Sequence, residues 1–396
     1  MPEPFKNLLN DKVVRNAAQH LRRAWPAFDG RTFERHALAG LDALEMKARA
    51  MHIADALEAT LPEDFGHVAE VLEASLAPLR PGAGAWGATS DSDGAPGAIA
   101  ATATAAIAAT DDSGLSGWVL WSVGDFVVRR GMAQPERALA VLHALTQRFT
   151  AEWAIRPFIV AHPVLCWATL ARWVDDPSEH VRRLVSEGSR PRLPWGLQLK
   201  GLIADPAPTL PLLRLLQDDP SQYVRRSVAN HLNDIAKDHP ALVAAWVEEH
   251  LPGASKQRLA LLKHASRTLV KKGDARTLKA WGLGKRLRGE ATLNVSPKRI
   301  SVGDSVGLEI VVRSASPRVQ KLVIDYAVHH VKASGETSAK VFKGWVIELA
   351  AHQERPLAKR HSMRPITTRR YHAGRHEVDV RINGEIVASA SFELRL

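Results

Sequence analysis

The sequence predicts a mostly α-helical protein, an α-solenoid of paired helices followed by a small all-β sandwich. One observation is a repeat: Asp-Asp-Pro-Ser-Glu-His-Val-Arg-Arg-Leu-Val at residues 175–185 returns as Asp-Asp-Pro-Ser-Gln-Tyr-Val-Arg-Arg-Ser-Val at 218–228, which is 43 residues later. That period is typical of HEAT and armadillo helix pairs, each of which buries its apolar face against the next. The other observation is that the apolar spacing changes from three or four residues to two after Gly284.

Length and composition indicate the number of domains and the class of binding partner. With 396 residues, 45% hydrophobic and 24% charged, the chain can bury a sizeable core and should form about two or three domains. Its 53 Lys and Arg against 42 Asp and Glu give a formal charge of +11, which favours a polyanionic partner, either nucleic acid or an anionic membrane surface.

Cysteine usage and hydropathy predict the cellular compartment of the protein. Cys166 is the single cysteine, lies among apolar residues and cannot form an intrachain disulfide, so we expect a buried thiol in a reducing cytoplasm. We expect no signal peptide, because no apolar run follows the start. The long uncharged stretch 95–110 is mostly Ala, Thr and Gly, which is too short and too weakly apolar to span a membrane.

The N-terminal part is predicted to hold the first helix pairs. Residues 9–80 repeat apolar positions at helical spacing, with a break at Pro62 and Asp64. Residues 81–117 are almost entirely Ala, Gly, Thr, Ser and Asp. Such a segment cannot bury enough apolar surface to offset its ordering entropy, and we predict a flexible insertion within a helical domain of residues 1–284.

Helices should resume at Trp118, and Pro135 should begin another that runs to Phe149. Prolines then punctuate the chain at helix-pair intervals. We predict the last periodic helix near residues 259–270, ended by Lys271-Lys272-Gly273, because cations followed by glycine are a helix stop signal.

Residues 285–396 are predicted to form the sandwich. Alternating runs at 308–312, 322–328, 343–349 and 377–382 predict strands, with a hairpin at Asn383-Gly384. From Glu290 onward there are 17 Lys and Arg against 11 Asp and Glu, a net charge of +6, so this domain is a candidate second contact with a polyanion.

Several motifs of other enzyme classes can be set aside. Gly-Asp-Ser-Val-Gly at 303–307 matches a nucleophile pattern, but it precedes a strand in an all-β domain and is predicted to be a turn. The 17 histidines contain no His-Glu-x-x-His, and Cys-x-x-Cys is absent, so no metal site is expected.

Three longer segments carry a resemblance to a known family. They are Arg148 to Phe158 (RFTAEWAIRPF), His180 to Trp195 (HVRRLVSEGSRPRLPW) and Tyr223 to Pro240 (YVRRSVANHLNDIAKDHP). They resemble the AlkC branch of the HEAT-like repeat DNA glycosylases, and the resemblance extends from Pro2 to about Gly284. The C-terminal part is similar to the immunoglobulin-like module that some AlkC-type proteins carry.

The resemblance implies a bacterial DNA glycosylase of base excision repair. Such an enzyme hydrolyses the N-glycosidic bond of cationic N-alkylated bases, with N3-methyladenine and N3-methylcytosine as the implied substrates. It implies a monomer that binds double-stranded DNA containing alkylated bases, with no metal or organic cofactor. The alternative is a non-catalytic HEAT-repeat scaffold that binds nucleic acid or an acidic protein through the same basic face.

Candidate catalytic residues follow from the chemistry of the implied reaction. A carboxylate beside an aromatic face can stabilise positive charge that develops on the sugar and can hold a water molecule. Glu152 is the first candidate and Asp125 the second, with Trp121 as the aromatic face. By pattern alone, Glu152 could equally pair with Arg156 one helical turn away, and Trp121 could be a packed core residue beside Asp125.

Candidate DNA-binding residues are polar or aromatic side chains in the resembling segments. Arginines suit phosphates and asparagines suit sugar or phosphate oxygens, although a solvated helix face or an ion pair would give the same pattern. Trp195 is expected in the core, with a base-facing role as the alternative. The candidates are Arg156, Arg183, Arg190, Arg192, Trp195, Arg225, Arg226, Asn230 and Asn233.

Overall fold

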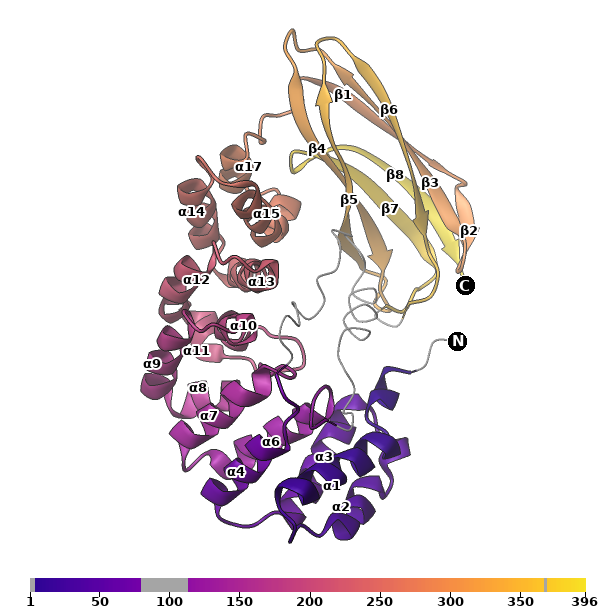
Figure 1. Ribbon diagram of the computed structural model, residues 1–396. Coiled ribbons are helices and arrows are strands. Elements are labelled where there is room, and N and C mark those ends of the chain that lie inside the picture. The colour runs from indigo at the N-terminus through magenta and orange to yellow at the C-terminus, as the bar shows by residue number, and fades with distance from the viewer. Residues whose placement is uncertain (1–3, 80–112, 367–368) are drawn as a thin grey trace. The chain divides into compact units, whose positions relative to one another are not determined.

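The computed structural model describes residues 4–79, 113–366 and 369–396. The chain divides into two compact units, the first comprising Met1–Asp238 with Ser255–Ala265 and the second His239–Ala254 with Ser266–Leu396. The first unit is helical, and the second joins three short helices to all the β-strands (Figure 1). The predicted class, a helical solenoid followed by a small immunoglobulin-like sandwich, is confirmed.

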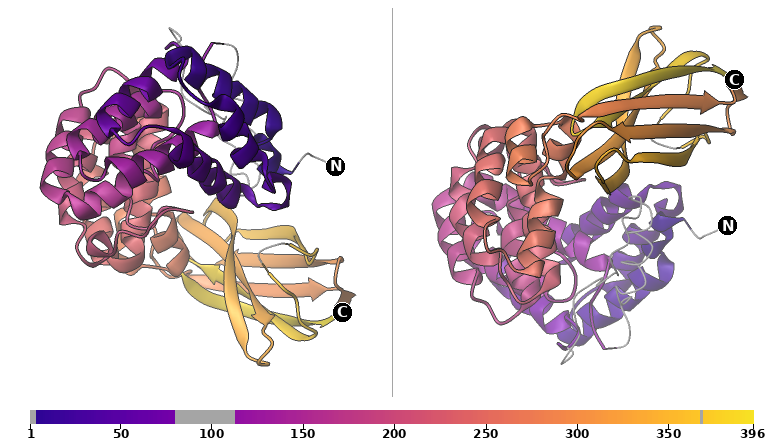
Figure 2. Two further views of the ribbon diagram at one scale, coloured as in Figure 1. Left: turned by 90° about the horizontal axis from the view of Figure 1, so that it is seen from below. Right: turned by 90° about the horizontal axis from the view of Figure 1, so that it is seen from above.

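The first unit consists of helices that pack as successive pairs (Figures 1 and 2). Helix α3 packs on α6, α10 on α13 and α13 on α15, while α1 packs on α4 and α4 on α7. Its elements are η1 (Phe5–Leu8), α1 (Asp11–Ala24), α2 (Gly30–Leu38), η2 (Leu41–Ala43), α3 (Met46–Thr60), α4 (Phe65–Ser75), α6 (Val119–Gly131), α7 (Pro135–Thr146), α8 (Ile155–Ala161), α9 (Pro163–Trp173), α10 (Glu179–Gly188), α11 (Lys200–Ala204), η3 (Ala207–Thr209), α12 (Leu210–Leu216), α13 (Gln222–Asp238) and α15 (Lys256–Ala265).

Local signals in the sequence account for where these helices begin. The Asp64 side chain accepts hydrogen bonds from the backbone N–H groups of Gly66 and His67 and thereby caps α4 at the predicted break. Pro135 is the first residue of α7, where its missing N–H has no helical partner to lose.

The repeated Asp-Asp-Pro-Ser motif forms the same turn twice. In each copy the second aspartate accepts a hydrogen bond of 2.8 Å from the serine backbone N–H, Asp176 from Ser178 and Asp219 from Ser221. The first arginine of each Arg-Arg pair then closes the turn. Nη1 of Arg182 donates to the carbonyls of Asp176 and Pro177, and Nη1 of Arg225 donates to those of Asp219 and Pro220.

Part of the predicted insertion is packed in the first unit. Leu115 is fully buried and exchanges backbone hydrogen bonds with Ser75 and Ala77 at the end of α4. The expectation of a flexible segment is therefore wrong for residues 113–117, because the buried side chain of Leu115 and its backbone hydrogen bonds hold them against α4. Residues 81–112 lie outside the described residues.

The second unit begins with three short helices, α14 (Pro240–His250), α16 (Arg267–Lys272) and α17 (Ala275–Ala280). Gly273 ends α16 with φ of 74°, as the cations and glycine predicted. A Cβ there would lie 2.9 Å from Cα of Gly384 in the β7–β8 turn, so a side chain is excluded. The predicted single last helix is wrong, because α15 and α16 are separate and α17 follows them.

In the described part of the second unit, eight strands form two sheets. The first sheet has the order β1-β3-β6, and the second has the order β2-β8-β7-β4-β5. Asn383 and Gly384 join β7 to β8 with φ of 51° and 87°, which is the hairpin predicted from the sequence. The bounds are β1 (Gly289–Ser296), β2 (Arg299–Ser301), β3 (Ser305–Ser314), β4 (Gln320–Val331), β5 (Thr337–Leu349), β6 (Glu354–Ser362), β7 (Gly374–Ile382) and β8 (Glu385–Arg395).

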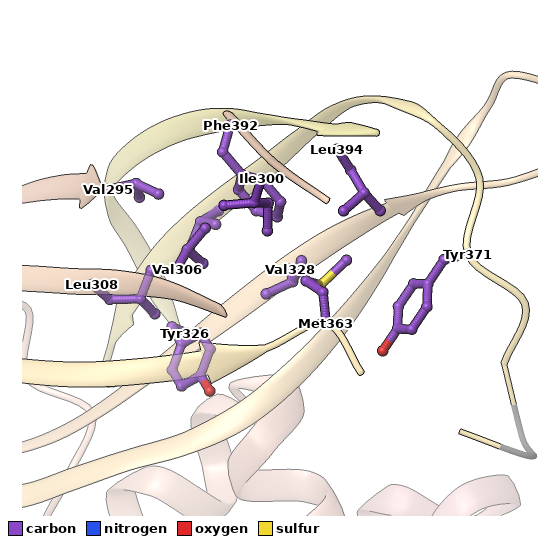
Figure 3. Close-up of a cluster of buried hydrophobic side chains, with 11 residues drawn as sticks. Val295, Ile300, Val306, Leu308, Tyr326, Val328, Met363, Tyr371, Phe392 and Leu394 are labelled. Atoms are coloured by element: carbon purple, nitrogen blue, oxygen red, sulfur yellow. The ribbon is translucent and has the colours of Figure 1, made fainter. Parts of the chain in front are cut away.

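Alternating strand residues from both sheets form the sandwich core. One cluster includes Val306 and Leu308 from β3, Val328 from β4 and Phe392 from β8, and Figure 3 shows these side chains between the strands. The Gly-x-Ser-x-Gly motif forms the turn into β3, since Asp304 accepts a hydrogen bond from the backbone N–H of Ser301.

Three histidines are buried beside this core. His330, His361 and His376 are 5%, 6% and 0% exposed. His330 accepts a hydrogen bond of 2.6 Å from Nη1 of Arg369, and the Tyr326 hydroxyl lies 3.1 Å from Nδ1 of His361. Within the described ranges, Nδ1 of His330 and Nε2 of His361 and His376 have no hydrogen-bond partner.

None of the helices that the structure describes is long and apolar enough to cross a membrane.

Candidate active site

Aromatic rings from several parts of the first unit gather at one place. Trp121 of α6 stacks on Trp153, with ring centroids 4.4 Å apart, and lies parallel to Trp195, with centroids 5.8 Å apart and 7° between the planes. Phe5 of η1 contacts both Trp118 and Trp195. Because Trp121 is only 7% exposed, its ring is packed between neighbours and offers little surface to a ligand.

Trp195 presents the exposed ring of this group. Its side chain is 56% exposed, so the expectation of a core residue is wrong. Its backbone φ is 63°, a conformation that is uncommon for a bulky residue and that concentrates at functional sites. The backbone thus holds a large aromatic side chain toward solvent at a local energetic cost.

Arg156 holds the loop that carries Trp195. It is fully buried, and its guanidinium donates hydrogen bonds to the carbonyls of Leu197 (2.6 Å), Gly188 (2.8 Å) and Arg190 (2.7 Å). Burial, the largest influence, lowers its pKa to about 10, so it stays a cation at neutral pH. The alternative of an ion pair with Glu152 is therefore wrong, and a contact of Arg156 with DNA stays a prediction that this burial does not favour.

Three carboxylates and two arginines form a buried network next to this loop. Arg183 Nη1 lies 2.7 Å from Glu152 Oε2, and Arg183 Nη2 lies 3.8 Å from Glu187 Oε2. Arg190 bridges Glu187 at 2.5 Å and Asp234 at 2.7 Å. Each of the five residues has a side chain that is at most 16% exposed.

The arginines keep Glu187 ionised. Burial alone would raise the pKa of Glu187, but Arg190, Arg183 and a hydrogen bond from the Ser227 hydroxyl lower it to about 2. Burial acts the other way on Arg190, and its carboxylate neighbours raise its pKa. A buried group of charges of this kind is a candidate functional site, because burying charges without a use is costly.

Covalent and hydrogen-bonded links join the carboxylates to the aromatic rings. Glu152 precedes Trp153, whose indole N–H donates to the carbonyl of Pro194 at 3.1 Å, and Pro194 precedes Trp195. Arg190 lies at the other end of the same loop. The site therefore combines negative charge with an exposed aromatic face, a combination that attracts and stabilises a cation.

The other predicted residues have more varied surroundings. Asp125 is half-buried and pairs with Arg129 at 2.7 Å, and Arg192 binds Asp238 through two hydrogen bonds of 2.8 Å. Asn233 is 4% exposed, so its contact with DNA stays a prediction that its burial does not favour. Arg225, Arg226 and Asn230 also lie on α13: Arg225 is half-buried and closes its turn, Asn230 hydrogen-bonds His264, and Arg226 is exposed.

The two Arg-Arg pairs of the repeat do not form one row of exposed cations. Arg182 and Arg225 are tied to backbone carbonyls and Arg183 to carboxylates, which leaves Arg226 as the exposed member. Sequence reasoning also missed Glu187 and Asp234. A signal was available, since each acid is four residues from a candidate in the motif, Arg183 in one copy and Asn230 in the other.

In the described part of the chain, no three His, Cys, Asp or Glu side chains are placed to hold a metal ion. His231 lies beside the network. It is neutral at pH 7, because burial lowers its pKa to about 4.

Comparison with known proteins places the chain in a family. The whole chain matches a structure of Pseudomonas fluorescens alkylpurine DNA glycosylase AlkC bound to DNA containing an abasic site analog, with a TM-score of 0.85, 34% identity and 100% of both chains covered. The chain belongs to the AlkC family. The Bacillus subtilis protein described as uncharacterized protein YhaZ is 34% identical over 98% of this chain and 99% of its own length. Residues 290–396 match the family described as the C-terminal Ig-like domain of YhaZ, so this AlkC family member carries that domain.

Proposed function

We propose that this protein is a DNA glycosylase that excises cationic N-alkylated bases, N3-methyladenine and N3-methylcytosine among them, in base excision repair. The observation that carries the proposal is the set of buried carboxylates beside exposed Trp195, in a chain that is alike along its whole length to an alkylpurine DNA glycosylase.

The chemistry of the lesion fits a site of this composition. An N3-alkylated base is already a cation and a good leaving group, so cleavage of its glycosidic bond needs little protonation. The enzyme must instead stabilise the positive charge that develops on the sugar and must position a water molecule. Ionised carboxylates in a buried setting do the first, and a carboxylate oxygen can accept a hydrogen bond from that water.

Glu152 remains the first candidate for the catalytic carboxylate. It accepts a hydrogen bond of 2.7 Å from the Thr150 hydroxyl and lies next to the tryptophan that contacts the Trp195 loop. Glu187 and Asp234 add negative charge to the same site, and Asp125 is the second candidate for the catalytic role. We assign the exposed aromatic face to Trp195 in place of Trp121, because Trp121 is covered.

Contacts with the DNA backbone would use cations outside the acidic network. Arg226 of α13 is exposed and suits a phosphate. In the β-sandwich, Lys359 of β6 lies 5.5 Å from the Trp345 ring, and Lys340 of β5 lies 5.8 Å from the Phe342 ring. Strands β5 and β6 are edge strands of the two different sheets, and we call the lysines that they carry the β5–β6 edge, a candidate second DNA contact. The protein would act as a monomer in the bacterial cytoplasm, without a metal or organic cofactor.

The decisive experiment is release of free base. Purified protein is incubated with DNA that carries N3-methyladenine or N3-methylcytosine, and released bases are measured by chromatography with mass detection. We expect both bases to be released and abasic sites to accumulate. Tight DNA binding without any release would contradict the proposal and would favour the non-catalytic scaffold.

A further inference from the structure

We propose that Arg183 is a positioning residue that holds Glu152 and Glu187 together as two ionised carboxylates, and that it is not a phosphate ligand. The inference rests on the proposed function, because it assigns Arg183 a task within the same site.

The guanidinium of Arg183 is already occupied by groups of the protein. Nη1 lies 2.7 Å from Glu152 Oε2 and donates a hydrogen bond of 3.1 Å to the Thr150 hydroxyl, while Nη2 faces Glu187. The ring of Tyr223 lies against the guanidinium, with its centroid 4.9 Å from Cζ. Since the side chain is 16% exposed, a DNA phosphate could reach it only by displacing a carboxylate.

Arg183 lies between Glu152 and Glu187, and Glu187 has Arg190 as a second cation. Without Arg183, the Glu152 carboxylate would lose its ion-pair partner and would repel Glu187, which favours uptake of a proton by one of the two carboxylates. Among the described residues, Arg183 is the one cation that forms ion pairs with both Glu152 and Glu187. Arg190 pairs with Glu187 and Asp234, which leaves Glu152 to Arg183.

The other charged and titratable groups around the pair do not replace Arg183. Arg156 of α8 is committed to backbone carbonyls. From α13, Asp234 adds negative charge, His231 is neutral, and burial raises the pKa of Tyr223 to about 12, so its phenol is neutral as well. Removal of Arg183 therefore leaves Glu152 without a compensating charge.

The repeat supplies a matched control. Arg226 occupies the position in the second Arg-Arg pair that Arg183 occupies in the first. Arg226 is exposed, whereas Arg183 is enclosed by carboxylates. Replacing Arg183 should therefore change the pH–rate profile and leave the salt dependence of DNA binding unchanged, whereas replacing Arg226 should do the reverse.

The test compares Arg183→Ala, Arg183→Lys and Arg226→Ala with the wild-type full-length protein. Single-turnover base release is measured across pH, DNA affinity is measured across salt, and glutamate carboxyl pKa values are followed by ¹³C NMR in the absence of DNA. For Arg183→Ala we expect the acidic limb of the pH–rate profile and a glutamate pKa to rise by at least about one pH unit, with the salt slope unchanged. For Arg226→Ala we expect an unchanged pH profile and a salt slope that is shallower by about one unit.

Arg183→Lys should lie between the wild type and Arg183→Ala in its pH profile, because one ammonium cannot face both carboxylates as a guanidinium does. This variant decides the question if Arg183→Ala does not fold. An Arg183 variant with a wild-type pH profile and a shallower salt slope would overturn the proposal. If the wild-type protein released no base, the proposed function would fail, and the glutamate titration would still test the role of Arg183.

Discussion

Acidification should destabilise the β-sandwich through its buried histidines. Burial, followed by the charge of Arg369, lowers the pKa of His330 to about 3 and that of His361 to about 4. These side chains are therefore neutral in the folded state but take up protons in the unfolded state below about pH 6.5. The stabilisation is fully present above that value and is lost as the pH falls from about 6.5 toward 4 for His361 and toward 3 for His330.

The expected size follows from the two pKa values. At pH 5 an unfolded histidine of pKa about 6.5 is 1.5 pH units below its midpoint, which corresponds to about 2 kcal/mol for each histidine that stays neutral when folded. His330 and His361 together would then cost the domain about 4 kcal/mol, an order-of-magnitude figure that is a large part of a typical domain stability.

Calorimetry between pH 8 and 5 would measure this effect, because it can resolve separate transitions of two units. His361→Gln keeps a polar side chain beside the Tyr326 hydroxyl but cannot gain a charge, so its unfolding free energy should fall with acid by about 1.4 kcal/mol less per pH unit. His352, exposed at φ of 57°, provides the control as His352→Asn, which should retain the wild-type pH dependence. A His361→Gln variant as acid-sensitive as the wild type would refute the reasoning.

Three further predictions concern the proposed activity. Glu152→Gln should lower base release by at least about a hundredfold with nearly unchanged DNA affinity, as expected for loss of one preorganised electrostatic group, and full activity would transfer the role to Asp125. Trp195→Ala should lower single-turnover base release by about tenfold or more, because stacking on one aromatic side chain is worth about 1–3 kcal/mol. Trp195→Phe should retain most of the release, and equal losses in both variants would argue against stacking. Replacing Lys340, Lys343 and Lys359 by alanine should weaken DNA binding and make its salt dependence shallower, and an unaltered slope in equilibrium titrations would exclude the β5–β6 edge as a DNA contact.

The architecture could be predicted from the sequence because its signals are periodic. The 43-residue repeat and the change of apolar spacing after Gly284 mark two classes of structure, and turn residues such as Asp64 and Asn383 act through their own backbone neighbours. Strands β1, β2 and β6 were missed. The short β2 and the mostly exposed β6 owe their pairing to partners distant in the chain.

The candidate site was less predictable, because the fate of a charged residue depends on what lies opposite. Arg156, Arg183 and Arg226 are chemically identical in the sequence, yet one is enclosed by carbonyls, one by carboxylates and one faces solvent. Glu187 and Asp234, 47 residues apart, are brought into one network by Arg190, which lies in the loop after α10 and pairs with both. The four-residue spacing from Arg183 and Asn230 could have singled out each acid, but it does not say that the two acids share one arginine.

The ion pairs that the arginines form within the protein also limit its long-range electrostatic attraction to DNA. Arg182 is held against Asp219, Arg190 against Glu187 and Arg192 against Asp238. Beyond the screening length of about 8 Å in physiological salt, each pair acts as a dipole whose field fades faster than that of a lone charge. Long-range attraction must therefore come from cations that have no acid beside them. The rate of association with DNA and the chemistry at the site would therefore depend on different arginines. The association rate could then change in evolution while the site chemistry is preserved.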